Sequence, residues 1–331
     1  MQARGPQDRW YLLYHRLRSG ALLALSYLWA VVLGSLLLWL PWSSETGGLS
    51  LVDALFTATS AVCVTGLTVV DTGSAFTVFG KSVILLLIQA GGLGIMTFSV
   101  LMALAIGRMP ALRDRWVIES MFGGNIKIQA WDLVKSIAVF TFICEAAGAV
   151  LLCVGWLNAG YPLGEALWYG LFHSVSAFCN AGFAFFPDSF EGFRGDLVVN
   201  LTVCGLIILG GIGFLVLYEL AGFFRSPINR RVSLNTRLVL WTTLVLLAAG
   251  AVGIYLLEAN NALQGMPLGQ KLLASFFQSA TARTAGFNTV NIAYLGNATI
   301  LLLMLLMFVG ASPGSCGGGI RTTSLALLIA L

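Results

Sequence analysis

The chain has 331 residues, of which 58% are hydrophobic and only 10% are charged, and its formal net charge at pH 7 is +4. Globular domains carry about 25% charged residues, so this chain has too few polar side chains to coat soluble domains of its size. Its mean hydropathy of +0.89 agrees. The composition excludes soluble domains and indicates an integral membrane protein surrounded by lipid.

Charge and cysteine patterns narrow the function classes further. The positive charge forms no basic stripe interleaved with aromatic residues, so we expect no nucleic-acid partner. The 6 cysteines stand singly, without CxxC spacing. This pattern predicts neither a disulfide framework nor a metal site.

Long apolar runs predict the membrane-spanning helices, since a span needs about 20 mostly apolar residues. In chain order they are 21–40, 83–106, 133–157, 197–224, 238–257 and a run that begins at Ala298. Taken in order, the six runs form three successive pairs. Between the two runs of each pair lies an apolar segment too short to span, at 51–62, 165–178 and 268–282. Such lengths suit half-helices that enter the bilayer and return on the same side. We therefore predict an all-α membrane protein of helix–half-helix–helix units at 21–106, 132–224 and 237–331, the last of them incomplete.

Basic residues are concentrated in the N-terminal segment 1–20 and in the loops 107–131 and 225–236. Lys and Arg mark the cytoplasmic side of membrane proteins. We therefore expect the N-terminus in the cytoplasm, with 1–20 lying on the membrane surface as an interfacial helix. The three half-helices would then enter from outside.

The half-helices and the turns that follow them are internal repeats. They align without a gap at 56–67, 172–183 and 276–287. Each aligned stretch begins with Phe and has glycine ten residues later, at Gly66, Gly182 and Gly286. Self-similarity of this kind indicates one structural unit used several times around an axis.

A half-helix that ends in a glycine turn inside the bilayer has a specific physical use. Its carboxyl end carries about half a negative charge, and its free carbonyl groups must line a polar cavity if they are not to remain unsatisfied. Several such ends around one axis form a site for a dehydrated monovalent cation. The alternative is that the glycines only allow close helix packing, but three aligned turns favour a pore.

The second helix of the third unit is interrupted by GASPGSCGGG at 310–319. A stretch so rich in glycine and proline is expected to leave the helix, as a simple kink or as a loop within the membrane, and its length favours the loop. Arg321 follows at membrane depth, where a charge is costly. It either faces the cavity and sets an electrostatic barrier or pairs with a neighbour for structure.

Four motifs carry a resemblance to a known family: SAVCVTGL at 60–67, SAFCNAGF at 176–183, TARTAGFNTV at 281–290 and GASPGSCGGGIR at 310–321. From about residue 22 onward the chain resembles the Trk/Ktr/HKT superfamily of potassium transporters, and it is most similar to the KtrB-type membrane subunits. The resemblance implies potassium-channel-like units around a pseudo-fourfold pore, three of them in this chain. A fourth unit would need roughly a hundred further residues, so we expect the sequence to be part of a longer protein.

The resemblance also assigns site residues. The selectivity-filter carbonyls would come from Val64, Thr65, Gly66, Asn180, Ala181, Gly182, Thr284, Ala285 and Gly286. The gate loop beneath the filter would use Gly310, Ser312, Gly314, Ser315, Gly317, Gly318 and Gly319. Glycine at every filter position is associated in this family with a preference for potassium, so K+ is the expected cargo, with no organic cofactor.

The partners and the location are likewise implied by the resemblance. The expected assembly is a homodimer docked on a cytosolic nucleotide-binding regulatory ring through the two basic loops. The expected location is the plasma (inner) membrane of a bacterium, where the protein would cross the bilayer several times.

Three other functions stay open from the residues. A sodium-conducting member of the same family would differ only in ion preference. A broken-helix secondary transporter also binds ions at helix breaks, but it predicts inverted repeats. The residues 310–314 match GxSxG, which an intramembrane serine protease would use as Ser312 with His173. A protease leaves the repeat unexplained, so we do not expect an enzyme.

Overall fold

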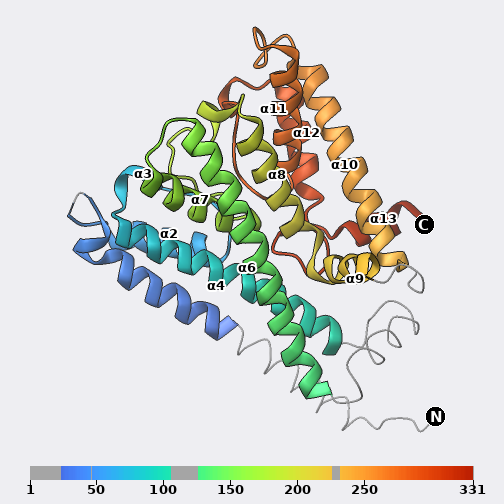
Figure 1. The fold of residues 1–331 in the computed structure, drawn as a ribbon, viewed down its shortest axis with the longest axis horizontal. Coiled ribbons are helices and arrows are strands. Elements are labelled where there is room, and N and C mark those ends of the chain that lie inside the picture. The colour runs from blue at the N-terminus through green and yellow to red at the C-terminus, as the bar shows by residue number, and fades with distance from the viewer. Residues whose placement is uncertain (1–23, 46, 106–125, 226–231, 331) are drawn as a thin grey trace.

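The computed structural model describes residues 24–45, 47–105, 126–225 and 232–330. Apart from one isolated antiparallel bridge between Ser44 and Phe76, the regular elements of these ranges are helices (Figure 1). The all-α prediction is therefore confirmed. The expected interfacial segment 1–20 and most of the two basic loops lie outside the described residues.

Along the chain, the helices form three sets, and the second helix of each set is one of the half-helices. The first set is a helix at Ala24–Trp39, α2 (Leu51–Val62) and α4 (Val78–Ala105). The second set is α6 (Ile126–Asn158), α7 (Leu163–Phe178), α8 (Leu197–Ile212) and α9 (Phe214–Arg225). The third set is α10 (Leu234–Glu258), α11 (Leu268–Thr281), α12 (Asn297–Phe308) and α13 (Thr322–Ala330). The connections contain the short turns η1 (Pro41–Ser43), α3 (Thr72–Ala75), η2 (Glu191–Phe193) and η4 (Ile292–Tyr294).

The helices α4, α6 and α10 each contain a stretch long and apolar enough to cross a membrane: Val78–Thr97, Val134–Asn158 and Leu234–Glu258. A fourth candidate span is bent, since α8 and α9 meet at 101°. We predicted a membrane-spanning helix over 197–224, and the structure divides this run into two helices at Gly213. Gly213 has φ +93°, and the N–H of Phe214 donates to the carbonyl of Gly314 at 3.0 Å. The N–H of Phe214 thus donates to a carbonyl distant in sequence instead of to a carbonyl of the same helix.

The half-helices α2, α7 and α11 begin where their local sequences dictate. Ser50 Oγ accepts the N–H of Asp53 at the start of α2, and Pro162 and Pro267 stand immediately before α7 and α11. Proline suits a helix start because the N–H it lacks would need no helical partner there. The half-helices have 12, 16 and 14 residues. At about 1.5 Å per residue, none of them reaches across a hydrocarbon core of about 30 Å.

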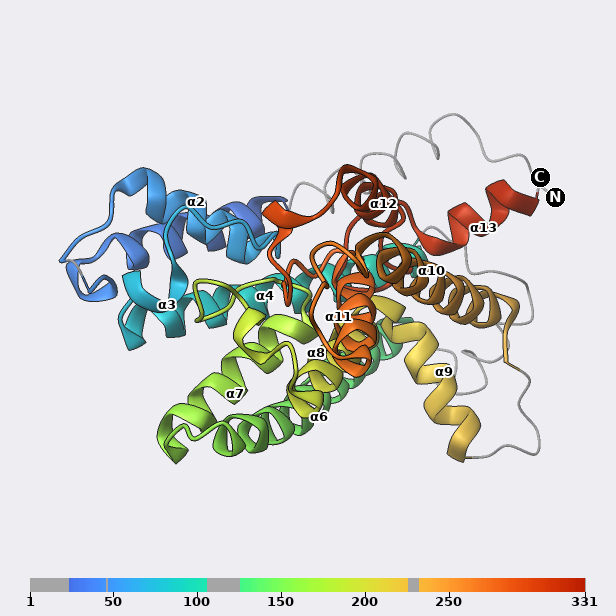
Figure 2. The same ribbon diagram turned by 90° about the horizontal axis from the view of Figure 1, so that it is seen from above.

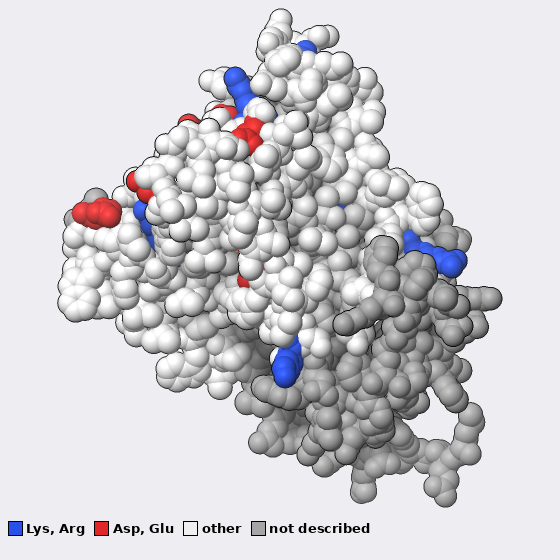
Figure 3. Space-filling view, in the orientation of Figure 1, with Lys and Arg blue, Asp and Glu red and all other residues white. Residues whose placement is uncertain are grey.

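The half-helices pack against the longer helices. α7 lies against α6 and α8, α11 against α10 and α8, and α2 against α4. Seen from above, the three approach a central region from different sides (Figure 2). The longer helices leave large apolar side chains exposed, among them Trp29, Trp241 and Leu256. In Figure 3 most of the acidic side chains, together with several basic ones, lie along the upper left margin, and most of the remaining face is free of charge. Such a face suits contact with lipid.

Candidate ion pathway

The turns that follow α2, α7 and α11 share one backbone conformation. We refer to residues 64–66, 180–182 and 284–286 as the first, second and third turns. In each, the first residue and the glycine have positive φ: 54° and 78° at Val64 and Gly66, 59° and 71° at Asn180 and Gly182, and 70° and 83° at Thr284 and Gly286. The sequence repeat is therefore also a repeat of backbone geometry.

Local hydrogen bonds produce this conformation in the first two turns. The N–H of Thr65 donates to the carbonyl of Ser60 at 2.8 Å, and the N–H of Val64 donates to that of Ala61 at 3.2 Å. The turn after α7 has the same two bonds, at 2.7 and 3.1 Å. Together they form the Schellman motif, which ends a helix with one left-handed residue. The third turn differs. The N–H of Ala285 donates at 2.9 Å to the carbonyl of Thr281, which lies four residues earlier in the chain, whereas the corresponding acceptors in the first two turns lie five residues earlier.

Two of the three left-handed first residues are strained. Val64 and Thr284 are β-branched, and a positive φ in such residues is rare and costs about 1–3 kcal/mol. Strain of this size persists only where the surroundings determine the backbone, and it is frequent at functional sites. The sequence interpretation relied on the glycines and missed this feature. The sequence did contain one indication of these left-handed residues. Asn180 aligns with Val64 and Thr284, and asparagine adopts the left-handed conformation more readily than most residues.

The three turns lie side by side, although they are far apart in sequence. A Cβ placed on Gly66 would clash with the carbonyl oxygen of Ala181, and one on Gly182 would lie 2.7 Å from the carbonyl oxygen of Ala285. The same relation thus holds from the first turn to the second and from the second to the third. Carbonyl oxygens of neighbouring turns meet at glycines, where there is no room for a side chain.

Side chains behind the second turn hold it in place. Ser176 Oγ donates to the carbonyl of Phe183 at 2.8 Å, and the N–H of Phe185 donates to Nε2 of His173 at 3.1 Å. His173 is fully buried and stacks on Phe186, with 5.5 Å between ring centroids. The second turn is therefore fixed by hydrogen bonds and by an aromatic cluster.

The other two turns have less side-chain support. In the third turn Thr281 Oγ1 accepts the N–H of Phe287 at 2.8 Å. Behind the first turn, Ser60 is the residue that aligns with Ser176, and its hydroxyl has no hydrogen-bond partner within the part of the chain that the structure describes. Leu67, which follows the first turn, is 61% exposed.

Gly91 in the middle of α4 and Gly210 near the end of α8 receive the half-helices. A Cβ on Gly91 of α4 would clash with the carbonyl oxygen of Val62, and one on Gly210 of α8 would clash with that of Phe178. Val62 and Phe178 occupy the same aligned position in their half-helices. These two glycines are required so that the end of each half-helix can touch the neighbouring long helix.

The segment 310–319 leaves the helical path between α12 and α13 and packs against α8. The N–H of Ser312 donates to the carbonyl of Gly211 at 2.9 Å, and the N–H of Cys316 donates to that of Gly210 at 3.3 Å. Gly314 accepts from Phe214 at the bend between α8 and α9. The bend in the second unit and the interrupted helix of the third unit therefore meet in the same contact.

Gly317 is the point of this segment that meets the turns. A Cβ on Gly317 would lie 2.6 Å from Oγ1 of Thr284 and 3.5 Å from the side-chain amide of Asn180. Gly318 has open space around it and is exposed. The segment therefore covers the second and third turns from the side of their left-handed residues.

The remaining residues of the expected gate stabilise the shape of the segment itself. Gly314 and Gly319 have φ of +76° and +80°, Gly310 lies too close to Gly318 for a Cβ, and Ser315 Oγ donates to the carbonyl of Ser312. These contacts are local, so the segment holds a defined conformation without being a helix.

Two arginines contact backbone carbonyls of the segment. Nη1 of Arg321 donates to the carbonyls of Ser312 and Gly317 at 3.2 and 2.9 Å. Nη2 of the buried Arg283 lies 3.5 Å from the carbonyl of Gly310. Both guanidinium groups thus contact backbone oxygens of the segment.

The residues that a serine protease would need have other hydrogen-bond partners in the structure. Ser312 Oγ bonds with Thr322 Oγ1 at 2.9 Å, while His173 uses Nδ1 on the carbonyl of Tyr169 and Nε2 on Phe185. Ser312 and His173 therefore have other partners and do not form a nucleophile–base pair. Within the described ranges, no group of three or more His, Cys, Asp and Glu is arranged to hold a metal ion.

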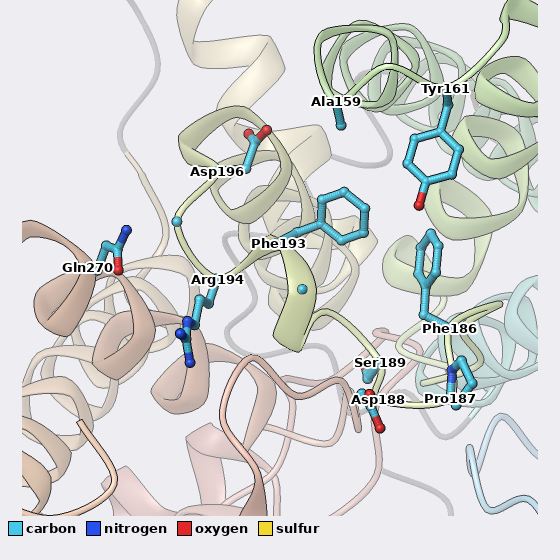
Figure 4. A pocket seen from close by; sticks show the side chains of 12 residues that line it. Ala159, Tyr161, Phe186, Pro187, Asp188, Ser189, Phe193, Arg194, Asp196 and Gln270 are labelled. Atoms are coloured by element: carbon cyan, nitrogen blue, oxygen red, sulfur yellow. The ribbon is translucent and has the colours of Figure 1, made fainter. Parts of the chain in front are cut away.

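A separate pocket of about 830 Å³ opens beside the second unit (Figure 4). It is lined by Tyr161, Phe186 and Phe193, with Asp188, Asp196, Arg194 and Gln270 at its margins. Partial burial, together with the nearby carboxylate of Asp188, raises the pKa of Glu191 in the adjoining loop. None of the residues of the three turns lines this pocket, so it lies off the candidate pathway.

Repeated half-helices, carbonyl-lined turns and an apolar exterior define a multi-pass membrane protein with a candidate cation pathway at its centre. The family model described as TrkH, cation transport protein, matches residues 23–331, and the chain belongs to this family. It is similar to the Ktr system potassium uptake protein B of Bacillus subtilis (strain 168), with 41% identity over 93% of this chain and 68% of that protein. The protein of the same name from Vibrio alginolyticus is also 41% identical, over 92% and 67%.

The fold agrees with that of a solved relative. The crystal structure of the potassium transporter TrkH from Vibrio parahaemolyticus matches with a TM-score of 0.67 at 20% identity. The match covers 92% of this chain and 59% of that one. At this identity the likeness establishes the fold, and the chain spans less than two thirds of that transporter's length.

Proposed function

We propose that this chain is the translocating membrane subunit of a bacterial potassium uptake system. Potassium ions would cross by channel-like passage, without chemical turnover, enzymatic activity or an organic cofactor. The observation that carries the proposal is the convergence of the three turns, where carbonyl oxygens of one turn reach the glycine of the next.

The three turns would form the selectivity filter. Backbone oxygens can replace the hydration water of a monovalent cation, and the carboxyl ends of three half-helices add negative potential at the same place. The filter oxygens in this proposal belong to Val64, Thr65, Gly66, Asn180, Ala181, Gly182, Thr284, Ala285 and Gly286. Both relatives at 41% identity are named as potassium uptake proteins, which favours K+ over Na+ as the cargo.

The segment 310–319 would be the gate below this filter. Its contact with Asn180 and Thr284 through Gly317 supports a position across the exit from the second and third turns. Glycine-rich backbone changes conformation at low cost, so a displacement of Gly317 would clear the route. Arg283 and Arg321 hold the closed form by bonding to its carbonyls.

The proposal includes an assembly and an orientation. The units at 21–106, 132–224 and 237–331 would share a pseudo-fourfold pore with a fourth unit of the same kind. The protein would be a homodimer bound to a cytosolic nucleotide-binding regulatory ring, in the inner membrane, with its N-terminus in the cytoplasm. The concentration of basic residues in 1–20, 107–131 and 225–236 supports this orientation.

The decisive experiment measures K+ and Na+ uptake in liposomes by the full-length natural protein. Gly66→Ser places a side chain against the carbonyl oxygen of Ala181. We expect the K+ to Na+ uptake ratio to fall by about tenfold, which corresponds to about 1.4 kcal/mol of discrimination. Gly47→Ser is the matched control, because Gly47 also has positive φ, at +81°, but meets nothing within 4 Å.

Each alternative outcome contradicts a named part of the proposal. An unchanged ratio in Gly66→Ser would remove the first turn from the filter. Uptake of Na+ in preference to K+ by the unchanged protein would replace the cargo. A ratio that falls equally in Gly47→Ser would show that the effect does not come from the turn.

A further inference from the structure

Two buried thiols lie together at the junction of the second turn and the segment 310–319. Cys179 ends α7 immediately before Asn180, and Cys316 lies within the segment one residue before Gly317. Cys179 is 1% exposed and Cys316 is 5% exposed. The transport proposal uses neither thiol.

Gly92 of α4 brings the two sulfur atoms to one place. A Cβ on Gly92 would lie 2.5 Å from Sγ of Cys179 and 3.7 Å from Sγ of Cys316. Sγ of Cys316 also lies 3.6 Å from the carbonyl oxygen of Gly92. Both sulfurs are therefore within 4 Å of the same point, on the same side of α4. Because glycine has no side chain, nothing from α4 stands between them.

We propose that Cys179 and Cys316 form a modification site, at which a peroxide converts the two thiols into a reversible disulfide. A disulfide brings its sulfurs to about 2.05 Å, so one side must move. Cys316 is the side that can move, since it lies in a glycine-rich segment, whereas Cys179 is fixed at the end of a buried half-helix.

The oxidation is balanced with hydrogen peroxide as the oxidant. The sulfur of one thiolate attacks a peroxide oxygen, the O–O bond breaks, and a sulfenic acid and hydroxide form. The sulfur of the second cysteine then attacks the sulfenic sulfur, the S–O bond breaks, the S–S bond forms and water leaves. Overall the two thiols lose two electrons and two protons, and one peroxide becomes two waters. A dithiol reductant reverses the oxidation by thiol–disulfide exchange.

The consequence for transport rests on the proposed function. The bond would tie the segment covalently to the base of the second turn, next to Gly317 and Asn180. A segment held there could not withdraw from the exit of the turns. Oxidation would therefore stop K+ uptake, and reduction would restore it.

The aligned cysteine of the first unit provides a matched control. Cys63 occupies the position of Cys179 at the end of α2, but it is exposed. It tests whether any thiol beside a turn is sufficient. If the pair is specific, Cys63→Ser should leave the response to peroxide unchanged, while Cys316→Ser and Cys179→Ser should each abolish it.

The test uses the full-length protein in liposomes, treated with hydrogen peroxide and then with dithiothreitol. Remaining thiols are blocked with N-ethylmaleimide, and linked peptides are identified by mass spectrometry. We expect a Cys179–Cys316 peptide, a fall in K+ uptake of at least about tenfold, and recovery on reduction. Either single variant, or both, should give an oxidised-to-reduced uptake ratio near unity.

The outcomes separate this inference from the proposed function. Absence of the Cys179–Cys316 peptide, or a linked peptide that contains Cys63 instead, overturns the thiol pair. A Cys179–Cys316 peptide with unchanged uptake supports the modification site but overturns the gate role of the segment. Peroxide inhibition that persists in both Cys316→Ser and Cys179→Ser overturns the link between this disulfide and transport.

Discussion

The first and second turns have the same backbone but unequal support. Both begin with a left-handed residue, both end in a left-handed glycine, and both close a half-helix with the same two hydrogen bonds. Ser176 and His173 bond to the chain that follows the second turn. The aligned Ser60 and Thr57 have buried hydroxyls without a hydrogen-bond partner among the described residues. The shape of a turn thus comes from local sequence, whereas its rigidity comes from the side chains behind it.

The largest effect is expected from Gly182→Ala, because the second turn cannot yield. Alanine in a left-handed conformation costs about 1–2 kcal/mol, and its Cβ would lie 2.7 Å from the carbonyl oxygen of the buried Ala285. We expect K+ uptake in liposomes to fall by at least about tenfold. Gly66→Ala should lose less, since the first turn is more exposed and can shift.

Gly160→Ala is the control for backbone strain. Gly160 has φ +91° and nothing within 4 Å of its Cβ position, so it shares the conformational cost without the carbonyl contact. Uptake should be retained in this variant. Equal losses in Gly160→Ala and Gly182→Ala would refute the role assigned to the contact.

Gly317→Ala should have the next largest effect, and it acts on the second and third turns but not on the first. The added Cβ would lie 2.6 Å from Oγ1 of Thr284 and 2.5 Å from the Cβ of Ala311, so the segment must move or the turns must. We expect K+ uptake to change severalfold. Gly318→Ala, with open space around it, should change uptake much less. A larger change in Gly318→Ala than in Gly317→Ala would contradict the assigned contact.

Ser176→Ala tests the support of the second turn directly. It leaves the carbonyl of Phe183 without its partner, which costs about 1–3 kcal/mol for a buried group. We expect a lower temperature of thermal unfolding in detergent and a lower K+ to Na+ uptake ratio. Ser60→Ala removes the aligned hydroxyl, which has no such bond, so its effect should stay within about 0.5 kcal/mol. The comparison fails if the two variants behave alike.

Thr57→Val should have the smallest effect. It replaces a buried, unpartnered hydroxyl with a methyl group of similar shape, a change that is nearly neutral or stabilising. We expect no fall in the unfolding temperature. A clear fall would show that Thr57 bonds to a group outside the described part of the chain, and the first turn would then be supported after all.

Much of the fold was predictable because its signals are local. The half-helix expected at 51–62 is α2 itself, and those expected at 165–178 and 268–282 differ from α7 and α11 by at most two residues at either end. Caps, prolines and apolar length set these limits, and all three act over a few residues. The long helices are similarly recognisable, except where a partner far along the chain intervenes.

That exception is the bend at Gly213. The apolar run over 197–224 predicts a single helix, and neither neighbouring sequence nor periodicity shows otherwise. The helix breaks because Phe214 bonds to Gly314, about a hundred residues later. Gly210, Gly211 and Gly213 permit a break there, but they do not require one.

By itself, the sequence determined the membrane environment, the all-helical class, the threefold repeat and the glycines of the three turns, because composition and local hydrogen bonding decide these. Only the tertiary structure decided which turn meets which, which turn is braced from behind, and that Cys179 and Cys316 lie together against Gly92. These are contacts between distant segments. They depend on how whole helices pack, and no short stretch of sequence specifies that.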